Sequence, residues 1–322
     1  MASFNFPAPD RQLFIRNFLH AIRGIGLHDA LRQAVRDIPA QTLRDELMRF
    51  APTSGLLALH GTGVRDEEVF ATPSLLRAAP GVLTYYRLLL GVSQKVFYGQ
   101  SSGLARFKTM EDSQTIRKDA DRLLEPFCTE LNLAMERLLS FLPTKTLGVD
   151  ISQLPLMTLG AQADGAWRGK IGQKATAGIF STLKTIIEKY AQTGLTESPT
   201  AVIVTNTAGR RITIALASDP DIVIREDVHG QDVYKVAIEI KGGTDRSNLH
   251  NRVGEAEKSH AKARAAGAQD CWTVIDLKDA DINRLKQESS STRQWFDLTE
   301  VLNKTGSSYD RLITLMRSAT GI

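Results

Sequence analysis

The spacing of apolar residues changes once along this 322-residue chain. Up to about residue 145 apolar side chains recur at helical intervals, as between Leu123 and Leu139. Further on, β-branched or alternating residues fill four short segments, at 201–205, 211–217, 222–225 and 233–241. We therefore expect a helical first part and a second part that contains a β-sheet.

The order of the expected elements gives the fold class. A helix at 175–190 precedes the four strands, and a helix at 248–266, a strand at 271–277 and two helical segments follow them. We predict a helical region at 1–165, suited to dimer or DNA contacts, and an α/β domain at 166–322 with a mixed sheet flanked by helices. Glycines and basic residues alternate near the joint, which predicts a flexible basic loop there: Gly160, Gly165, Arg168, Gly169, Lys170, Gly172 and Lys174.

Composition excludes several classes of protein. No apolar stretch approaches the roughly 20 residues that span a bilayer, and the first residues lack the pattern of a secretory signal, so we expect a cytoplasmic protein. Cys128 and Cys271 belong to no CxxC pair and are expected to be reduced, buried thiols. The phosphate-loop patterns GxGxxG and GxxxxGK[ST] are missing, so no nucleotide cofactor is expected. The net charge of +4 and a pI near 9.0 mildly favour a polyanionic partner.

The residues most suggestive of chemistry lie at the ends of two neighbouring strands. Asp221 opens one strand, and Glu239 and Lys241 close the next. Alternation predicts one face made of Tyr234, Val236, Ile238 and Ile240, and the opposite face made of Ala237, Glu239 and Lys241.

A turn at His229 and Gly230 would close these strands into a hairpin and bring Asp221 beside Glu239. Two carboxylates next to an ammonium suit Mg²⁺, which often takes only one or two protein carboxylates. Such an ion would polarise a phosphate and acidify a bound water, while Lys241 would position that water and offset negative charge. The alternative is that Pro220-Asp221 is a turn and that Glu239 and Lys241 form the solvent face of an edge strand.

The arrangement resembles the PD-(D/E)XK nuclease superfamily over roughly residues 175–280, with Pro220-Asp221, seventeen intervening residues, then Glu239-Ile240-Lys241. The resemblance implies a restriction-endonuclease-like core. It also implies that Asp221, Glu239 and the backbone carbonyl of Ile240 bind the metal and that Lys241 is the catalytic lysine. Several restriction enzymes take another metal-site acid from the following helix, and Glu255 stands at the matching distance from Lys241.

The segment after Lys241 is predicted to bind DNA. Restriction enzymes that read CCGG-containing targets carry an Arg-Ser-Asp-Arg-like element there, and Thr244-Asp245-Arg246 is similar to its last part, without the first arginine. Asp245 would accept from cytosine and Arg246 would donate to guanine. Asn248 and Arg252, at the start of a locally basic helix, complete the predicted DNA-binding set.

Two other residues of this helix have more ordinary interpretations. Glu257 is expected on an exposed face, paired with Lys258 or Lys262, and the same exposed position is the alternative for Glu255. His260 is expected to pack against the core in a stripe with Leu249, Val253, Ala256 and Ala263.

As a whole the sequence resembles type II restriction endonucleases, and most of all the XcyI and XmaI group, which is associated with CCCGGG and a 5′ CCGG overhang. That resemblance implies a Mg²⁺-dependent homodimer that cuts double-stranded DNA at a palindromic site. The alternatives are a repair or recombination nuclease that reads DNA structure, and a non-catalytic DNA-binding protein of the same fold.

Overall fold

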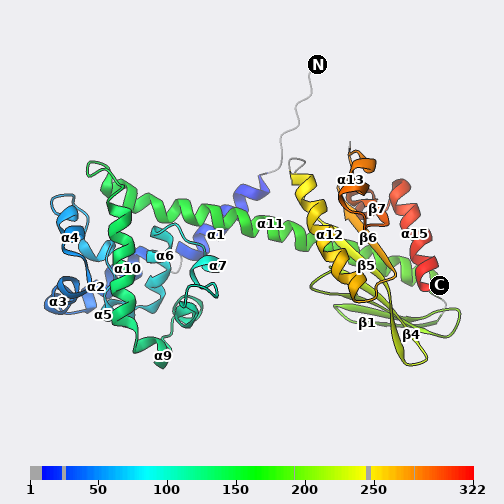
Figure 1. Ribbon diagram of the computed structural model, residues 1–322, viewed down its shortest axis with the longest axis horizontal. Coiled ribbons are helices and arrows are strands. Elements are labelled where there is room, and N and C mark those ends of the chain that lie inside the picture. The colour runs from blue at the N-terminus through cyan, green and yellow to red at the C-terminus, as the bar shows by residue number, and fades with distance from the viewer. Residues whose placement is uncertain (1–8, 24–26, 192, 244–247, 279) are drawn as a thin grey trace, which may run out of the picture. The chain divides into compact units, whose positions relative to one another are not determined.

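The computed structural model describes residues 9–23, 27–191, 193–243, 248–278 and 280–322. The chain divides into two compact units, Met1–Trp167 and Arg168–Ile322 (Figure 1). Each unit has a hydrophobic core of its own. No helix in the described ranges is long and apolar enough to cross a membrane.

The first unit is helical. Its described helices are α1 (Asp10–Arg23), α2 (Leu27–Asp37), α3 (Ala40–Phe50), α4 (Thr53–Leu59), α5 (Pro73–Ala78), α6 (Leu83–Leu89), α7 (Gln94–Phe97), α8 (Lys108–Asp112), α9 (Lys118–Asp121), α10 (Leu124–Leu139) and the first part of α11 (Leu147–Tyr190). Short 3₁₀ turns lie at Asp66–Glu68, Pro80–Val82 and Ala105–Phe107. The core packs around fully buried residues such as Phe70, Tyr85 and Met135, as the helical spacing predicts.

The flexible loop predicted between the two parts is wrong, because the whole glycine-containing stretch lies inside α11. A glycine in a helix interior costs roughly 1 kcal/mol relative to alanine. Buried apolar residues on both sides, such as Leu159, Ala163, Ala175 and Ile179, favour a continuous helix. Packing along the helix therefore outweighs the local preference of its glycines.

The strands of the second unit form a sheet that, within the described residues, has seven strands in the order β1-β2-β3-β4-β5-β6-β7. The strands are β1 (Thr193–Glu197), β2 (Ala201–Thr205), β3 (Arg211–Leu216), β4 (Ile222–Val228), β5 (Gln231–Lys241), β6 (Asp270–Ile275) and β7 (Gln294–Asp297). Neighbours from β1 to β5 are antiparallel, and β5, β6 and β7 are parallel. The predicted mixed sheet is confirmed, although the prediction missed β1 and β7.

Helices cover both faces of this sheet (Figure 1). The second part of α11 packs on one face together with α14 (Leu298–Asn303) and α15 (Gly306–Thr320). On the other face α12 (Leu249–Ala265) contacts β5 and β6 through Val253 and Ala263, with α13 (Ile282–Glu288) beside it. The two cysteines are free and buried, as predicted.

The predicted faces of β5 need one correction, which concerns Tyr234. Ile224 pairs with Val236 while Arg225 pairs with Tyr234, so the register shifts by one residue between them. This bulge carries Tyr234 to the face of Ala237 and α12, whereas Val236, Ile238 and Ile240 face the core beneath α11. The alternation toward the end of the strand, where Glu239 lies, is as predicted.

Candidate active site

The hairpin of β4 and β5 brings the predicted residues together. The two strands pair from Ile222 with Ile238 to Val228 with Gln231. His229 and Gly230 form the two-residue turn, both with positive φ, of 55° and 82°. Such a turn matches the twist of paired strands and fixes their register. Asp221, directly before Ile222, is thereby held beside the end of β5, so the predicted hairpin is confirmed.

Asp221 is anchored to the backbone of β5. Its Oδ2 accepts a hydrogen bond of 2.7 Å from the amide of Ile240. Burial and the nearby charge of Glu239 raise the pKa of Asp221 to about 6, although the Ile240 amide and Lys241 oppose this shift. Asp221 and Glu239 therefore repel each other when both are ionised, and a cation bound to them would offset this repulsion.

Glu239 and Lys241 form an ion pair in which Nζ of Lys241 lies 2.9 Å from Oε1 of Glu239. The same Nζ lies 3.2 Å from Oε2 of Glu255, on α12. Burial lowers the pKa of Lys241, but the two carboxylates outweigh it and the net shift is upward. The edge-strand alternative is excluded, because β5 pairs with β4 on one side and with β6 on the other and Glu239 is 8% exposed.

The donor set suits a divalent cation that keeps part of its water shell. Among the described residues, no three side chains of His, Cys, Asp or Glu surround a common metal position. Asp221, Glu239 and the carbonyl of Ile240 remain as hard oxygen donors at one end of β5, which is a sufficient protein contribution for Mg²⁺. Glu255 bonds to Lys241, and its side chain is 64% exposed.

A polar group not predicted from the sequence lies behind Glu239. The hydroxyl of Ser259, on α12, is 2.9 Å from Oε2 of Glu239 and 2.5 Å from Oδ1 of Asp219. Nζ of Lys262 is 2.7 Å from the other oxygen of Asp219. Ser259 was not part of the predicted apolar stripe, and the only sequence signal was its helical spacing, three residues after Ala256.

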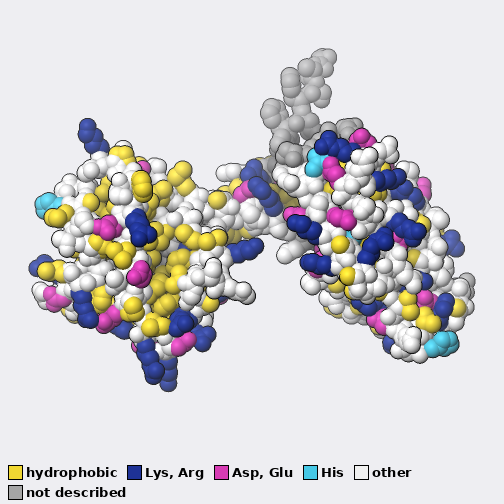
Figure 2. Space-filling view, in the orientation of Figure 1, with side chains coloured by type: hydrophobic (Ala, Val, Ile, Leu, Met, Phe, Trp, Pro, Cys, Tyr) yellow, Lys and Arg dark blue, Asp and Glu magenta, His cyan; other side chains and the backbone are white. Residues whose placement is uncertain are grey.

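The predicted DNA-binding residues divide between described and undescribed parts of the chain. Asp245 and Arg246 lie outside the described residues. Asn248 is exposed just before α12, and Nη1 of Arg252 donates to the carbonyl of Gly243. Figure 2 shows lysine and arginine side chains on the visible face of the second unit. Within α12, Lys258, Lys262 and Arg264 are exposed.

Two further predictions on α12 have different outcomes. His260 is fully buried, with Nε2 2.9 Å from Oγ1 of Thr273, so its interpretation as a packed residue is confirmed. Glu257 is not paired with lysine, because its carboxylate accepts hydrogen bonds from Ser289 and from the amide and hydroxyl of Ser291. The loop after α13 supplies these donors, and helical spacing alone could not indicate it.

Residues 16–322 match the family of XcyI restriction endonucleases. The chain belongs to this family. It is 37% identical to the type II restriction enzyme XcyI of Xanthomonas campestris pv. cyanopsidis, over 99% of this chain and 96% of that protein. It is 36% identical to the type II restriction enzyme Cfr9I of Citrobacter freundii, over 98% of this chain and 96% of that protein. The protein is therefore a type II restriction endonuclease, which decides against the repair nuclease and the non-catalytic binder.

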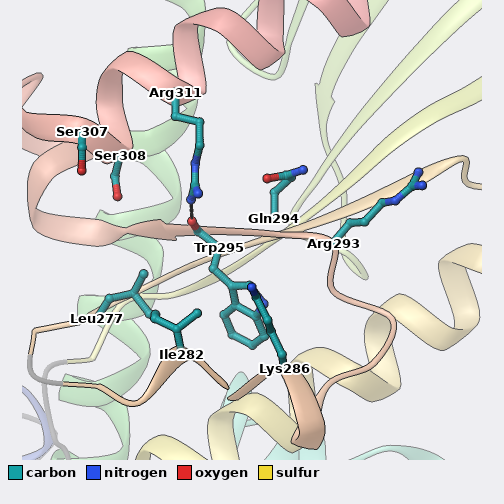
Figure 3. A pocket seen from close by; sticks show the side chains of 9 residues that line it. All are labelled: Leu277, Ile282, Lys286, Arg293, Gln294, Trp295, Ser307, Ser308 and Arg311. Atoms are coloured by element: carbon teal, nitrogen blue, oxygen red, sulfur yellow. Dashed lines mark hydrogen bonds between the residues drawn. The ribbon is translucent and has the colours of Figure 1, made fainter. Parts of the chain in front are cut away.

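A cavity in the second unit of this endonuclease is separate from the residues above. It has a volume of 330 Å³ and lies along β7, between α13 and the start of α15. Figure 3 shows Trp295 and Lys286 on one side of the strand and Ser307 and Ser308 on the other, with Arg311 donating to the carbonyl of Trp295. Asp221, Glu239 and Lys241 do not line it, so it is not the candidate active site.

Proposed function

We propose that this endonuclease hydrolyses DNA phosphodiester bonds with Mg²⁺ at the end of β5, as an enzyme of the PD-(D/E)XK type. The supporting observation is the meeting of Asp221, anchored on the Ile240 amide, with the ion pair of Glu239 and Lys241. Asp221, Glu239 and the carbonyl of Ile240 would hold the ion. When bound, Mg²⁺ supplies charge stabilisation at the phosphate and a more acidic water.

Lys241 acts in this proposal as a hydrogen-bond donor. Its raised pKa keeps the ammonium protonated at neutral pH, so it cannot accept a proton from the attacking water. A protonated Nζ can instead orient that water and offset negative charge that develops on the phosphate. Glu239 holds this ammonium at the site through the contact of 2.9 Å, and Glu255 supports it from α12.

We further propose a short palindromic G·C-rich target, CCCGGG, cut to leave a 5′ overhang. Family membership and the Thr244-Asp245-Arg246 segment support this target, with Asn248 and Arg252 assisting from the start of α12. A cytoplasmic homodimer would match the two-fold symmetry of such a site. The first unit exposes large apolar side chains suited to subunit contact, including Phe141 at 85%.

The test is cleavage of phage DNA of known sequence, with Mg²⁺ and with a chelator, by the wild-type protein and Lys241→Ala. We expect discrete fragments from the wild type whose ends map to CCCGGG, and no fragments with the chelator. Lys241→Ala should still shift a CCCGGG duplex in a binding assay while cutting at least about 100-fold more slowly, which is the usual scale for losing such a group.

The controls separate the parts of the proposal. Lys278→Ala removes an exposed lysine outside the candidate site and should cut like the wild type. Fragments that persist in chelator would contradict the metal requirement. Fragment ends at another sequence would overturn the proposed target while leaving the chemistry in place.

A further inference from the structure

Ser259 occupies an unusual position for a polar residue. Its side chain is on the buried face of α12 and the residue is 5% exposed, among neighbours that include Val253, Ala256 and Ala263. A helix does not need a hydroxyl there, since alanine is the best helix former. The hydroxyl instead reaches two carboxylates that belong to different segments, Asp219 before β4 and Glu239 on β5.

These contacts form a continuous chain of charged and polar groups. Lys262 bonds Oδ2 of Asp219, whose Oδ1 meets the Ser259 hydroxyl. The same hydroxyl meets Oε2 of Glu239, and Oε1 of Glu239 meets Lys241. Both oxygens of Glu239 are thus held in place, one by α12 and one by the lysine of its own strand.

A serine hydroxyl carries one hydrogen, so it can donate to only one of the two carboxylates at a time. Asp219 and Glu239 therefore compete for a single donor while lysines neutralise them from the two outer sides. Without the hydroxyl, Oε2 of Glu239 would lose its donor and the carboxylate could rotate about its side-chain torsions. Groups that orient metal ligands in this way commonly change metal affinity by 10–100-fold when they are removed.

We propose that Ser259, which lies between Glu239 and the ion pair of Asp219 and Lys262, is a positioning residue that fixes the Glu239 carboxylate in the orientation in which it binds a divalent cation. This inference rests on the proposed function. Ser259 itself contacts neither the DNA nor the ion in this role, and it acts only through Glu239.

The experiment measures Ca²⁺ binding to the full-length protein by calorimetry, for the wild type, Ser259→Ala and Ser259→Thr. We expect Ser259→Ala to weaken Ca²⁺ binding about 10-fold or more and to raise the Mg²⁺ concentration for half-maximal cleavage by a similar factor. The cleavage rate at saturating Mg²⁺ should fall less. Ser259→Thr keeps the hydroxyl and should bind Ca²⁺ within about threefold of the wild type, since its donor is retained.

Ser289→Ala is the matched control. Ser289 is also a buried serine whose hydroxyl bonds a glutamate of α12, in this case Glu257. Its loss should lower the unfolding temperature but leave the Ca²⁺ affinity unchanged. A merely structural Ser259 would behave in the same way, so a lower unfolding temperature with unchanged Ca²⁺ affinity in Ser259→Ala overturns the inference.

Two further outcomes have defined meanings. If Ser259→Ala does not fold, Ser259→Cys decides, because its thiol occupies the same place on α12 but is only a weak hydrogen-bond donor. Weaker Ca²⁺ binding by Ser259→Cys supports the inference, and wild-type binding contradicts it. If the wild type itself binds no Ca²⁺, the proposed metal site fails, whereas a wild type and Ser259→Ala of equal affinity refute only the positioning role.

Discussion

At Asp221 the charge that the proposed metal site would use opposes the stability of the fold. Its pKa rises from 3.8 to about 6 because the carboxyl is buried next to Glu239. Between these two pH values the folded protein holds a proton that the unfolded chain has released. The free energy of unfolding therefore decreases as pH rises through this window, and above pH 6 the ionised Asp221 costs roughly 3 kcal/mol. A bound cation would offset that cost.

Asp221→Asn should therefore stabilise the protein while abolishing cleavage. The amide can still accept the Ile240 hydrogen bond but carries no charge, so we expect it to raise the free energy of unfolding by up to about 3 kcal/mol at pH 7.5. The difference should shrink to under about 1 kcal/mol near pH 4, where the wild-type carboxyl is itself protonated. Denaturant unfolding in chelator at both pH values measures it. Equal stability of the two proteins at pH 7.5 would show that the ionised Asp221 does not destabilise the fold.

At the level of elements, the residues within the hairpin were predictable and their surroundings were not. Strand alternation placed Glu239 and Lys241 on one face, because the side-chain period is local. The bulge that turns Tyr234 over depends on pairing with β4, and the donors to Glu257 come from a distant loop. The helix through Gly165 and Gly172 depends on packing on both sides of the joint. Strand pairing and helix packing are tertiary properties, and the local patterns of a single sequence do not reveal them.

Gly242 lies where the end of β5 packs against α11, and we predict that alanine at this position destabilises the protein. An added Cβ would lie 2.5 Å from Cβ of Ala175 and 3.1 Å from the carbonyl oxygen of Ile171. Neither atom can move aside without moving the helix, so Gly242→Ala should cost about 1–3 kcal/mol and slow cleavage by shifting Lys241. Thermal unfolding and a cleavage assay measure the two effects.

Gly254 provides the matched control for this substitution. It lies inside α12, and no described atom outside its own helix turn would lie within 4 Å of an added Cβ. Gly254→Ala should raise stability by up to about 1 kcal/mol, since alanine favours helix. Unchanged stability in Gly242→Ala would mean that β5 and α11 separate easily, and that Lys241 does not depend on their contact.

The number of candidate active sites in each chain limits how many DNA strands one molecule can cut at a time. Asp221, Glu239 and Lys241 make up one candidate active site in each chain, at the end of β5. One site can attack one phosphodiester bond at a time, and the two strands of DNA run in opposite directions. The proposed homodimer would bring two such sites to a palindromic target, one for each strand.

A dimer with only one working site should nick its target. We expect heterodimers of wild-type and Lys241→Ala subunits, isolated through two different affinity tags, to convert a plasmid with one CCCGGG site into open circles that persist. Wild-type dimers should give linear DNA without much accumulation of circles, and Lys241→Ala dimers should leave the plasmid supercoiled. Subunit exchange is controlled by mixing the two homodimers and retesting after the longest incubation. Linear product from the heterodimer at the wild-type rate would mean that one Lys241 serves both strands, and the proposed division of the two cuts between subunits would be wrong.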